Sequence, residues 1–195
     1  FSDPKNDPEF TLLQRQRIEA ISRSQRLPKS LKIHADNSAS FWDLHKYPAF
    51  NAVRIGLLQY GVLPDKNSNL CKLDISPTLS FYTKIGLIKK LPKGTSISYG
   101  RKYILKKDSK IAILTAGYGD GIPIAYGKKG SVIIRDQLCQ IIGQITMDQT
   151  IVDVTELESV EAGEIAILIG ASENRVISLE SFSEQSMTIP WEILC

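Results

Sequence analysis

Apolar and polar positions follow two different patterns along the chain, one before and one after about residue 75. Near the start, Phe10, Leu13, Ile18 and Ile21 fall on one helical stripe, with Gln and Arg on the opposite side. Beyond residue 75, short β-branched runs are separated by Gly and Asp, which is typical of an antiparallel sheet or barrel. The pattern predicts a βα-type piece joined to a mostly β domain.

The first 25 or so residues are predicted to form one helix. Asp7 can cap it, Pro8 suits the first helical position, and Glu9 complements the helix dipole. Pro28 is expected to end the helix, because proline cannot continue the hydrogen-bonded ladder.

Two predicted strands follow, and each ends in a loop suited to an anion. Residues 31–36, "LKIHAD", run into Asn37 and Ser38, where exposed backbone N–H groups attract anions. Residues 51–61, "NAVRIGLLQYG", contain Gly56, which lets backbone approach a ligand. Capping alone explains a Ser or Asn in the first loop. Because βα-barrel sites gather at the carboxyl ends of strands, two consecutive loops of this kind indicate a site.

Pro77 marks the expected boundary between the two parts, within residues 73–78. We therefore assign residues 1–74 to the first domain and 75–195 to the second. The "GYGDG" stretch matches no phosphate-binding fingerprint and by itself predicts a hairpin turn, since Gly-Asp-Gly favours positive φ. The last 20 residues predict a helix turn followed by an extended tail.

Composition narrows the class of protein. Apolar residues make up 43% and charged residues 23%, as in a soluble globular protein. A net charge of +3 with scattered lysines gives nucleic-acid binding no support. The longest apolar runs are too short to span a bilayer, and the opening residues do not resemble a secretory signal.

Cysteine and histidine usage argues against disulfide and metal sites. Three widely spaced cysteines fit a reducing compartment, and a cytoplasmic location is the default. His34 lies in a predicted strand and is expected to be a hydrogen-bonded core or near-site residue. His45 is expected on a surface helix. Neither pairs with another ligand at metal-binding spacing.

Six motifs occur in the order and spacing of one family. They are "HADNSAS", "VRIGLLQYG", "GTSISYG", "AGYGDGIP", "IIGQITMDQTIVDVT" and "IPWEILC". The chain resembles the PLP-dependent alanine racemases from its first residues to its last. The resemblance implies the end piece of an α/β barrel (PLP fold type III) followed by a mostly antiparallel β domain, with the N-terminal half of the barrel absent from this chain.

The resemblance implies a binding site for pyridoxal 5'-phosphate (PLP) in the first domain. Ser38 and the backbone amides of Gly56 and Leu57 are expected to contact the cofactor phosphate. Arg54 is expected to face the pyridine nitrogen. Because a guanidinium is always charged, Arg54 keeps that nitrogen unprotonated and makes the ring a weaker electron sink, which suits racemisation.

The resemblance also implies catalytic and substrate-binding residues in the second domain. Tyr99 is expected to be the second catalytic base, opposite a lysine, and to reach the active site of the neighbouring subunit in a homodimer. A free phenol titrates near ~10, so such a base needs positive charge nearby. Tyr118 and the backbone N–H of Met147 are expected to bind the amino-acid substrate across the dimer. Without the resemblance, Tyr99 is a strand-end aromatic.

Two departures from the family pattern stand out. The Schiff-base lysine belongs to a strand that this chain does not contain, so the chain alone is expected to be inactive. Trp191 occupies the place of a tail tyrosine that helps to hold the phosphate. An indole N–H donates a hydrogen bond but accepts none, so phosphate affinity or tail position is in doubt.

The leading hypothesis is therefore an isomerase that interconverts L-alanine and D-alanine for peptidoglycan synthesis in the cell wall. One alternative is a racemase of another small amino acid, such as serine. Another is a non-catalytic dimerisation or scaffold module, and a third is an unrelated β-barrel binding domain. None of these readings involves a metal, nucleic acid or membrane.

Overall fold

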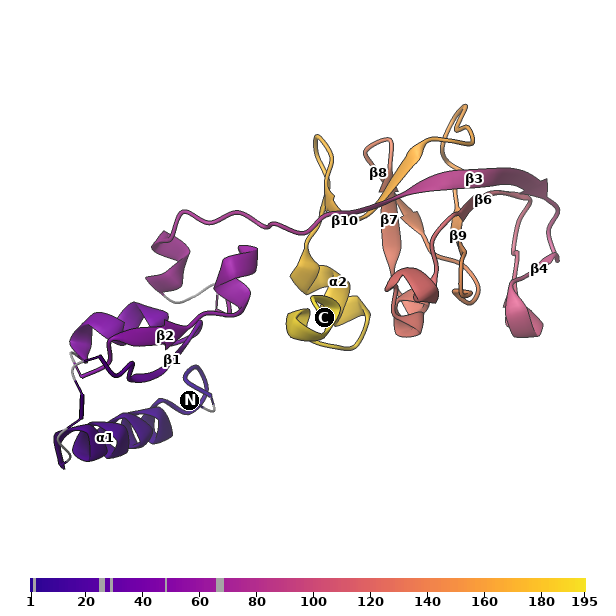
Figure 1. The fold of residues 1–195 in the computed structure, drawn as a ribbon. Helices are drawn as coiled ribbons and strands as arrows, with labels where there is room; N and C mark the ends of the chain where they lie inside the picture. Colours follow the sequence, from indigo (N-terminus) through magenta and orange to yellow (C-terminus); the bar gives the residue numbers. More distant parts are fainter. Residues whose placement is uncertain (2, 25–26, 29, 48, 66–68) are drawn as a thin grey trace. The chain divides into compact units, whose positions relative to one another are not determined.

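The computed structural model describes residues 1, 3–24, 27–28, 30–47, 49–65 and 69–195. The chain divides into two compact units (Figure 1), unit 1 (Phe1–Thr78) and unit 2 (Leu79–Cys195). Unit 1 contains a helix, two parallel strands and short 3-10 helices. Unit 2 is built around one antiparallel sheet.

Unit 1 opens with the predicted helix, α1 (Pro8–Ser24). The Phe10 N–H donates to the carboxylate of Asp7 at 3.0 Å, which confirms Asp7 as the cap and Pro8 as the first helical residue. Thr11 and Arg15 are the buried residues of α1. The apolar stripe is not the face that packs inside unit 1, because Phe10, Leu13 and Ile21 are exposed.

The two predicted strands of unit 1 are present as β1 (His34–Asn37) and β2 (Ala52–Arg54). They pair in parallel, with His34 opposite Ala52 and Asn37 opposite Arg54. Parallel pairing places the carboxyl ends of both strands at one edge. The loops after them therefore lie side by side. The remaining elements of unit 1 are the 3-10 helices η1 (Phe41–Lys46), η2 (Leu57–Tyr60) and η3 (Asn69–Lys72).

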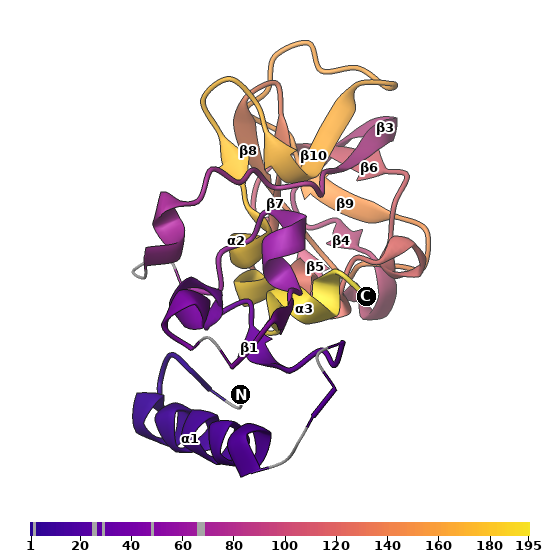
Figure 2. The same cartoon turned by 60° about the vertical axis from the view of Figure 1, so that its left-hand side comes forward.

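Unit 2 confirms the predicted antiparallel sheet. Seven strands pair in the order β8-β7-β10-β3-β6-β9, with β11 added to β10. A bridge between Ile141 and Val152 links the two ends of this order, so the sheet nearly closes into a barrel (Figure 2). Its strands are β3 (Phe81–Leu91), β6 (Ser109–Leu114), β7 (Ser131–Ile134), β8 (Gln137–Gln140), β9 (Thr150–Asp153), β10 (Ile165–Ala171) and β11 (Val176–Ile177).

The core of unit 2 lies inside the curved sheet. Side chains that alternate along the strands are fully buried there, among them Leu114, Val132, Val152 and Leu168. Helix α2 (Leu179–Gln185) packs against β10 and η6 (Ile124–Lys128). Its Phe182 ring meets the Tyr126 ring of η6 at a centroid distance of 4.2 Å. This aromatic pair lies within the packed core.

Two predictions about local structure are wrong. The tail is not extended, because Pro190–Ile193 forms α3, whose first residue is a proline with its φ already set for a helix. The "GYGDG" stretch is not a hairpin turn, because β6 pairs with β3 and β9 and not with the next strand. It forms the 3-10 helix η5 (Tyr118–Asp120), where the Asp120 carboxylate accepts the Gly117 N–H at 2.9 Å.

Candidate functional site

The loops after β1 and β2 bring two predicted phosphate-binding residues together. The Gly56 N–H donates to the Ser38 hydroxyl at 2.8 Å, and Ser38 is buried. Asn37 shapes the first loop, since its side-chain oxygen accepts the N–H groups of Ala39 and Ser40 at 3.1 and 3.2 Å. Leu57 follows directly as the first residue of η2.

Arg54 ends β2 at the same edge and is held by β1. One guanidinium nitrogen lies 2.6 Å from the His34 Nδ1, and the other donates to the Ala35 carbonyl at 3.3 Å. His34 is exposed, so it is not part of the core. These contacts fix a permanent positive charge beside the two loops.

Sequence reasoning missed a buried ion pair behind this edge. An Arg15 guanidinium nitrogen lies 2.6 Å from the Asp36 carboxylate, and Asp36 is completely buried. Burial by itself lowers the pKa of Arg15, but the hydrogen bond to Asp36 raises it, and the net pKa lies above the ordinary value. The pair ties α1 to β1 immediately before Asn37. An aspartate directly after Ala35 in a predicted strand was the only signal in the sequence.

A phosphate fits the edge of unit 1 chemically. Ser38 supplies a hydroxyl, Leu57 a backbone N–H and Arg54 positive charge. The Gly56 N–H donates to the Ser38 hydroxyl here, so it reaches a phosphate only by releasing that bond. The nearby Asp36 carboxylate is already bound to Arg15. A Cβ at Gly56 would lie 3.8 Å from the Ser38 hydroxyl oxygen, so any side chain there would fill the space beside the hydroxyl. Glycine leaves this space open for a ligand.

Tyr99 stands on a strained turn of unit 2. It begins η4 (Tyr99–Arg101), between β4 (Ser96–Ile97) and β5 (Tyr103–Ile104). The preceding residue, Ser98, has φ 61° and ψ −175°, a region used almost only by glycine, which costs about 1–3 kcal/mol. Tyr99 itself is 73% exposed. A strained turn that presents an exposed phenol is a reason to look for function at this position.

Tyr118 and Met147 lie on two loops joined through their backbones. The Tyr118 N–H donates to the Thr146 carbonyl at 2.9 Å, and the Gly119 N–H donates to the Met147 carbonyl at 2.8 Å. Because a peptide unit is planar and trans, the Met147 N–H points opposite to the Thr146 carbonyl. The first bond therefore sets the direction of the Met147 N–H. Both side chains are exposed.

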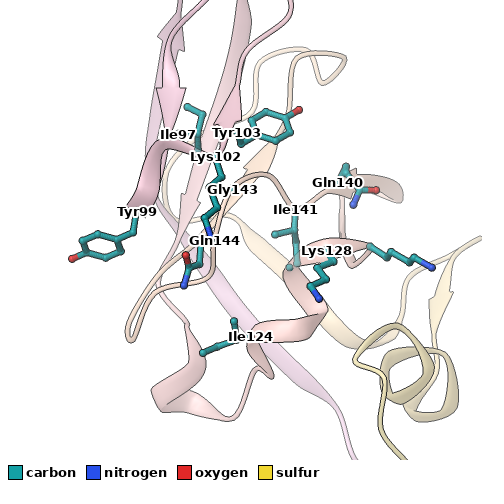
Figure 3. Close-up of a pocket in the computed structure, with 12 residues that line it drawn as sticks. Ile97, Tyr99, Lys102, Tyr103, Ile124, Lys128, Gln140, Ile141, Gly143 and Gln144 are labelled. Carbon is teal, nitrogen blue, oxygen red and sulfur yellow. The ribbon is translucent and has the colours of Figure 1, made fainter.

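A pocket of about 850 Å³ opens beside Tyr99 in unit 2. Figure 3 shows Ile141 and Lys128 on its wall, and the phenol of Tyr99 pointing away from them. Lys102, Lys128 and Lys129 line this pocket, and among the described residues that line it none is acidic. The lysines give the wall of this pocket a positive potential. Sequence reasoning did not single out these lysines.

Trp191 lies on α3 and is 48% exposed. Helix α3 packs against α2. Within unit 2, the hydrogen bonds that connect the Tyr118 and Met147 loops do not involve Trp191. Its role at a phosphate therefore stays a prediction.

The described residues give no sign of two other kinds of site. No group of three or more His, Cys, Asp or Glu side chains in this part of the chain is placed to hold a metal ion. None of the helices described in the structure has the length and apolar character needed to cross a membrane.

Solved structures share this fold. Alanine racemase from Bacillus anthracis with bound L-Ala-P matches with a TM-score of 0.87 and 29% identity, covering 100% of this chain and 50% of that one. Alanine racemase from E. faecalis matches with a TM-score of 0.89 and 26% identity, covering 100% and 51%. The fold is thus that of an α/β barrel end piece followed by the β domain of this class of isomerases.

Sequence comparisons define the family. Residues 78–195 match the family model described as alanine racemase, C-terminal domain. Alanine racemase 2 of Caldanaerobacter subterraneus is 40% identical over 162 residues, covering 83% of this chain and 41% of the relative. Alanine racemase of Methylacidiphilum infernorum is 39% identical over 194 residues, covering 100% and 48%. The chain belongs to the alanine racemase family and spans less than half the length of these two relatives.

Proposed function

We propose that this chain is the C-terminal part of a PLP-dependent alanine racemase. The whole enzyme interconverts L-alanine and D-alanine in the cytoplasm and supplies D-alanine for peptidoglycan. It acts as a homodimer in which unit 2 of one subunit completes the site of the other. The lysine that holds the cofactor lies outside this chain, so the chain alone has no racemase activity.

The backbone pairing between the Tyr118 and Met147 loops carries the proposal. It supports a fixed direction for the Met147 N–H, which donates to the carboxylate of the amino acid. The Thr146 carbonyl and the Tyr118 N–H, 2.9 Å apart, hold that peptide in place before any substrate arrives. Such preorganised donors stabilise an anion without reorganisation. The exposure of Tyr99, Tyr118 and Met147 fits side chains that complete a site on another subunit.

Unit 1 supports cofactor binding. The Ser38 hydroxyl and the amides of Gly56 and Leu57 would hold the PLP phosphate, and Arg54 would face the pyridine nitrogen. When bound, PLP supplies an electron sink that acidifies the α-hydrogen of an amino acid. Arg54 is oriented by His34 at 2.6 Å, and a guanidinium beside the pyridine nitrogen would keep that nitrogen unprotonated.

Tyr99 moves a proton at its phenol oxygen. Racemisation removes a proton from one face of Cα and returns one on the other face, so two groups on opposite faces are needed. Tyr99 serves one face, and the lysine outside this chain serves the other. Lys102, Lys128 and Lys129 line the neighbouring pocket.

Loss of optical rotation of L-alanine by the full-length protein with PLP tests the proposal. Tyr99→Phe is expected to slow turnover by ~10²–10⁴-fold, the usual contribution of a general acid–base group. The visible absorbance of the bound cofactor should persist, because Tyr99 does not hold it. Tyr82→Phe is the matched control, since Tyr82 is another exposed tyrosine of unit 2, on β3. Unchanged turnover in Tyr99→Phe removes Tyr99 from the mechanism.

Substrate and assembly need separate measurements. Turnover of serine without turnover of alanine would show that serine is the substrate, and turnover of neither would favour a non-catalytic dimerisation module.

Mixing inactive Arg54→Ala and Tyr99→Phe subunits is expected to restore activity to about a quarter of the sites, because half of the dimers are mixed and each has one intact site. No recovery from subunits shown to exchange would contradict sites shared across the dimer.

Trp191 offers a test of phosphate binding. If Trp191 weakens the hold on the phosphate, Trp191→Tyr is expected to lower the dissociation constant for PLP. A tyrosine hydroxyl both donates and accepts hydrogen bonds, whereas an indole N–H only donates. Unchanged PLP affinity, measured by cofactor fluorescence, would show that residue 191 does not help to hold the phosphate.

A further inference from the structure

Ser98 connects the Tyr99 turn to a distant segment of unit 2. Its hydroxyl donates to the Gln144 carbonyl at 2.5 Å, although the two residues are 46 positions apart. The donor is the residue directly before Tyr99, and the acceptor lies three residues before Met147.

The backbone has a positive φ near both ends of this bond, at Ser98 and at Gly143. Ser98 adopts φ 61° and ψ −175°, which a residue with a side chain rarely holds without outside support. Gly143 has φ 72°, and a Cβ there would lie 2.8 Å from the Ser98 Cβ and 3.0 Å from an Ile97 methyl carbon. Only a residue without a side chain allows the two segments to come this close. The contact therefore depends on Ser98 and Gly143 together.

The bond joins a longer connected path. From Gln144 the chain passes through buried Ile145 to Thr146, whose carbonyl accepts the Tyr118 N–H. One framework thus connects Tyr99, Met147 and Tyr118. In the proposed function these residues move the proton and bind the amino acid.

We propose that Ser98 is a positioning residue, which holds the Tyr99 phenol in register with the Met147 backbone and the Tyr118 loop. This inference rests on the proposed function, because it concerns where the general base stands relative to the substrate carboxylate. Without the hydroxyl, the left-handed turn loses its hydrogen bond to the 143–147 segment. The phenol is then free to shift. Displacements of about 1 Å at a reacting group cost on the order of 10²-fold in rate.

Ser98→Ala in the full-length enzyme with PLP tests this role. We expect kcat to fall at least about tenfold, with KM for alanine changed less than about threefold, because the phenol acts in the proton transfer and not in substrate binding. Ser96→Ala is the matched control. Ser96 lies on the same hairpin and accepts a hydrogen bond from Arg101 at 3.0 Å, but its hydroxyl has no described bond to the 143–147 segment.

An isotope measurement separates positioning from general destabilisation. With Cα-deuterated alanine, Ser98→Ala should raise the primary isotope effect for the enantiomer whose proton Tyr99 removes. It should leave unchanged or lower the effect for the other enantiomer. A purely structural loss reduces the amount of active enzyme and moves neither isotope effect. Wild-type kcat and isotope effects in Ser98→Ala overturn the proposal.

Hydrogen exchange tests the connection without relying on activity. Amides of residues 98–101 and 144–147 should exchange faster in Ser98→Ala, and at the wild-type rate in Ser96→Ala. If the wild-type protein racemises no amino acid, the proposed function fails, while faster exchange still supports the tether. If the wild type is active and exchange in Ser98→Ala is unchanged, the tether is wrong and the proposed function stands.

Discussion

Gly117→Ala is expected to damage the candidate site through a purely steric effect. Gly117 has an extended backbone at φ −144°, which alanine adopts without strain. A Cβ at this position would nevertheless lie 2.1 Å from the Thr146 carbonyl oxygen and 2.6 Å from the Asp148 nitrogen. Real Cβ atoms stay beyond 3.0 Å from such neighbours, and both contacts are backbone atoms that no rotamer change removes. The two loops must therefore separate by about 0.9 Å, the shortfall from that limit.

The displaced carbonyl belongs to the peptide that carries the Met147 N–H. Its bond from the Tyr118 N–H, now 2.9 Å, is expected to break or lengthen. Losing one or two such bonds costs about 1–3 kcal/mol of stability. A shift near 1 Å in a substrate-positioning group costs on the order of 10²-fold in kcat/KM. The combined signature is a modest fall in melting temperature with a large fall in kcat/KM for alanine.

Steady-state racemisation and thermal unfolding of the full-length holoenzyme measure both effects. Gly121→Ala is the matched control, because Gly121 lies in the same stretch at φ 97° and a Cβ there would meet nothing within 4 Å. That variant is expected to lose stability through backbone strain while keeping kcat/KM within about threefold. Wild-type kcat/KM in a folded Gly117→Ala enzyme would refute the reasoning.

Three further predictions concern buried or paired groups. Arg15→Met leaves the fully buried Asp36 carboxylate without its partner and should cost about 3–5 kcal/mol of unfolding free energy, measured by urea denaturation. The pKa of Asp136 is lowered to about 2, chiefly by the Ser172 hydrogen bond, against about 3.9 in an unfolded chain. Its stabilisation is present above about pH 4 and is lost as pH falls toward 2, so Asp136→Asn should flatten stability over that range. Burial raises the pKa of Cys139 to about 11, so native protein at pH 8 should alkylate there much more slowly than at the chain's two exposed cysteines, as read by peptide mass spectrometry.

Each of these predictions has its own control. Arg23→Met removes a pair between exposed Arg23 and half-buried Glu19 at 3.5 Å and should cost less than about 1 kcal/mol. An equal loss in both arginine variants would contradict the role given to burial. If Asp136→Asn and the wild type lose stability equally as pH falls, the hydrogen bonds of Asp136 are not the cause of that loss. Equal labelling rates at all three cysteines would contradict the burial of Cys139.

The sequence predicted the elements whose signals are local. Asp7 and Pro8 marked the start of α1, because capping chemistry depends on adjacent residues. Short β-branched runs between Gly and Asp predicted strands where β3 and β10 lie, because such residues favour strands and their flanking residues favour turns. This pattern did not give their pairing with each other, which joins segments far apart in the chain.

The sequence predicted residues of the candidate site only where they belong to a recognisable motif. The loops of Ser38 and Gly56 were expected to belong to one site because both follow strands, and a hydrogen bond joins these two residues. The tie from Ser98 to Gln144 was not predictable, because it depends on a backbone angle that serine rarely adopts. The prediction of an extended tail was wrong because Pro190, whose φ suits the first position of a helix, begins α3.

The near closure of the unit 2 sheet has a consequence for synthesis on the ribosome. Strand β3 pairs with β6 on one side, but its other side needs β10, which begins about 74 residues after β3 ends. At 5–20 residues per second, that edge waits roughly 4–15 s for its partner. An open strand edge invites pairing with other chains, and lysines discourage it. Lys84 lies in the part of β3 that pairs with β10 and is exposed in the folded unit, so it is suited to protect this edge of the nascent chain during the interval.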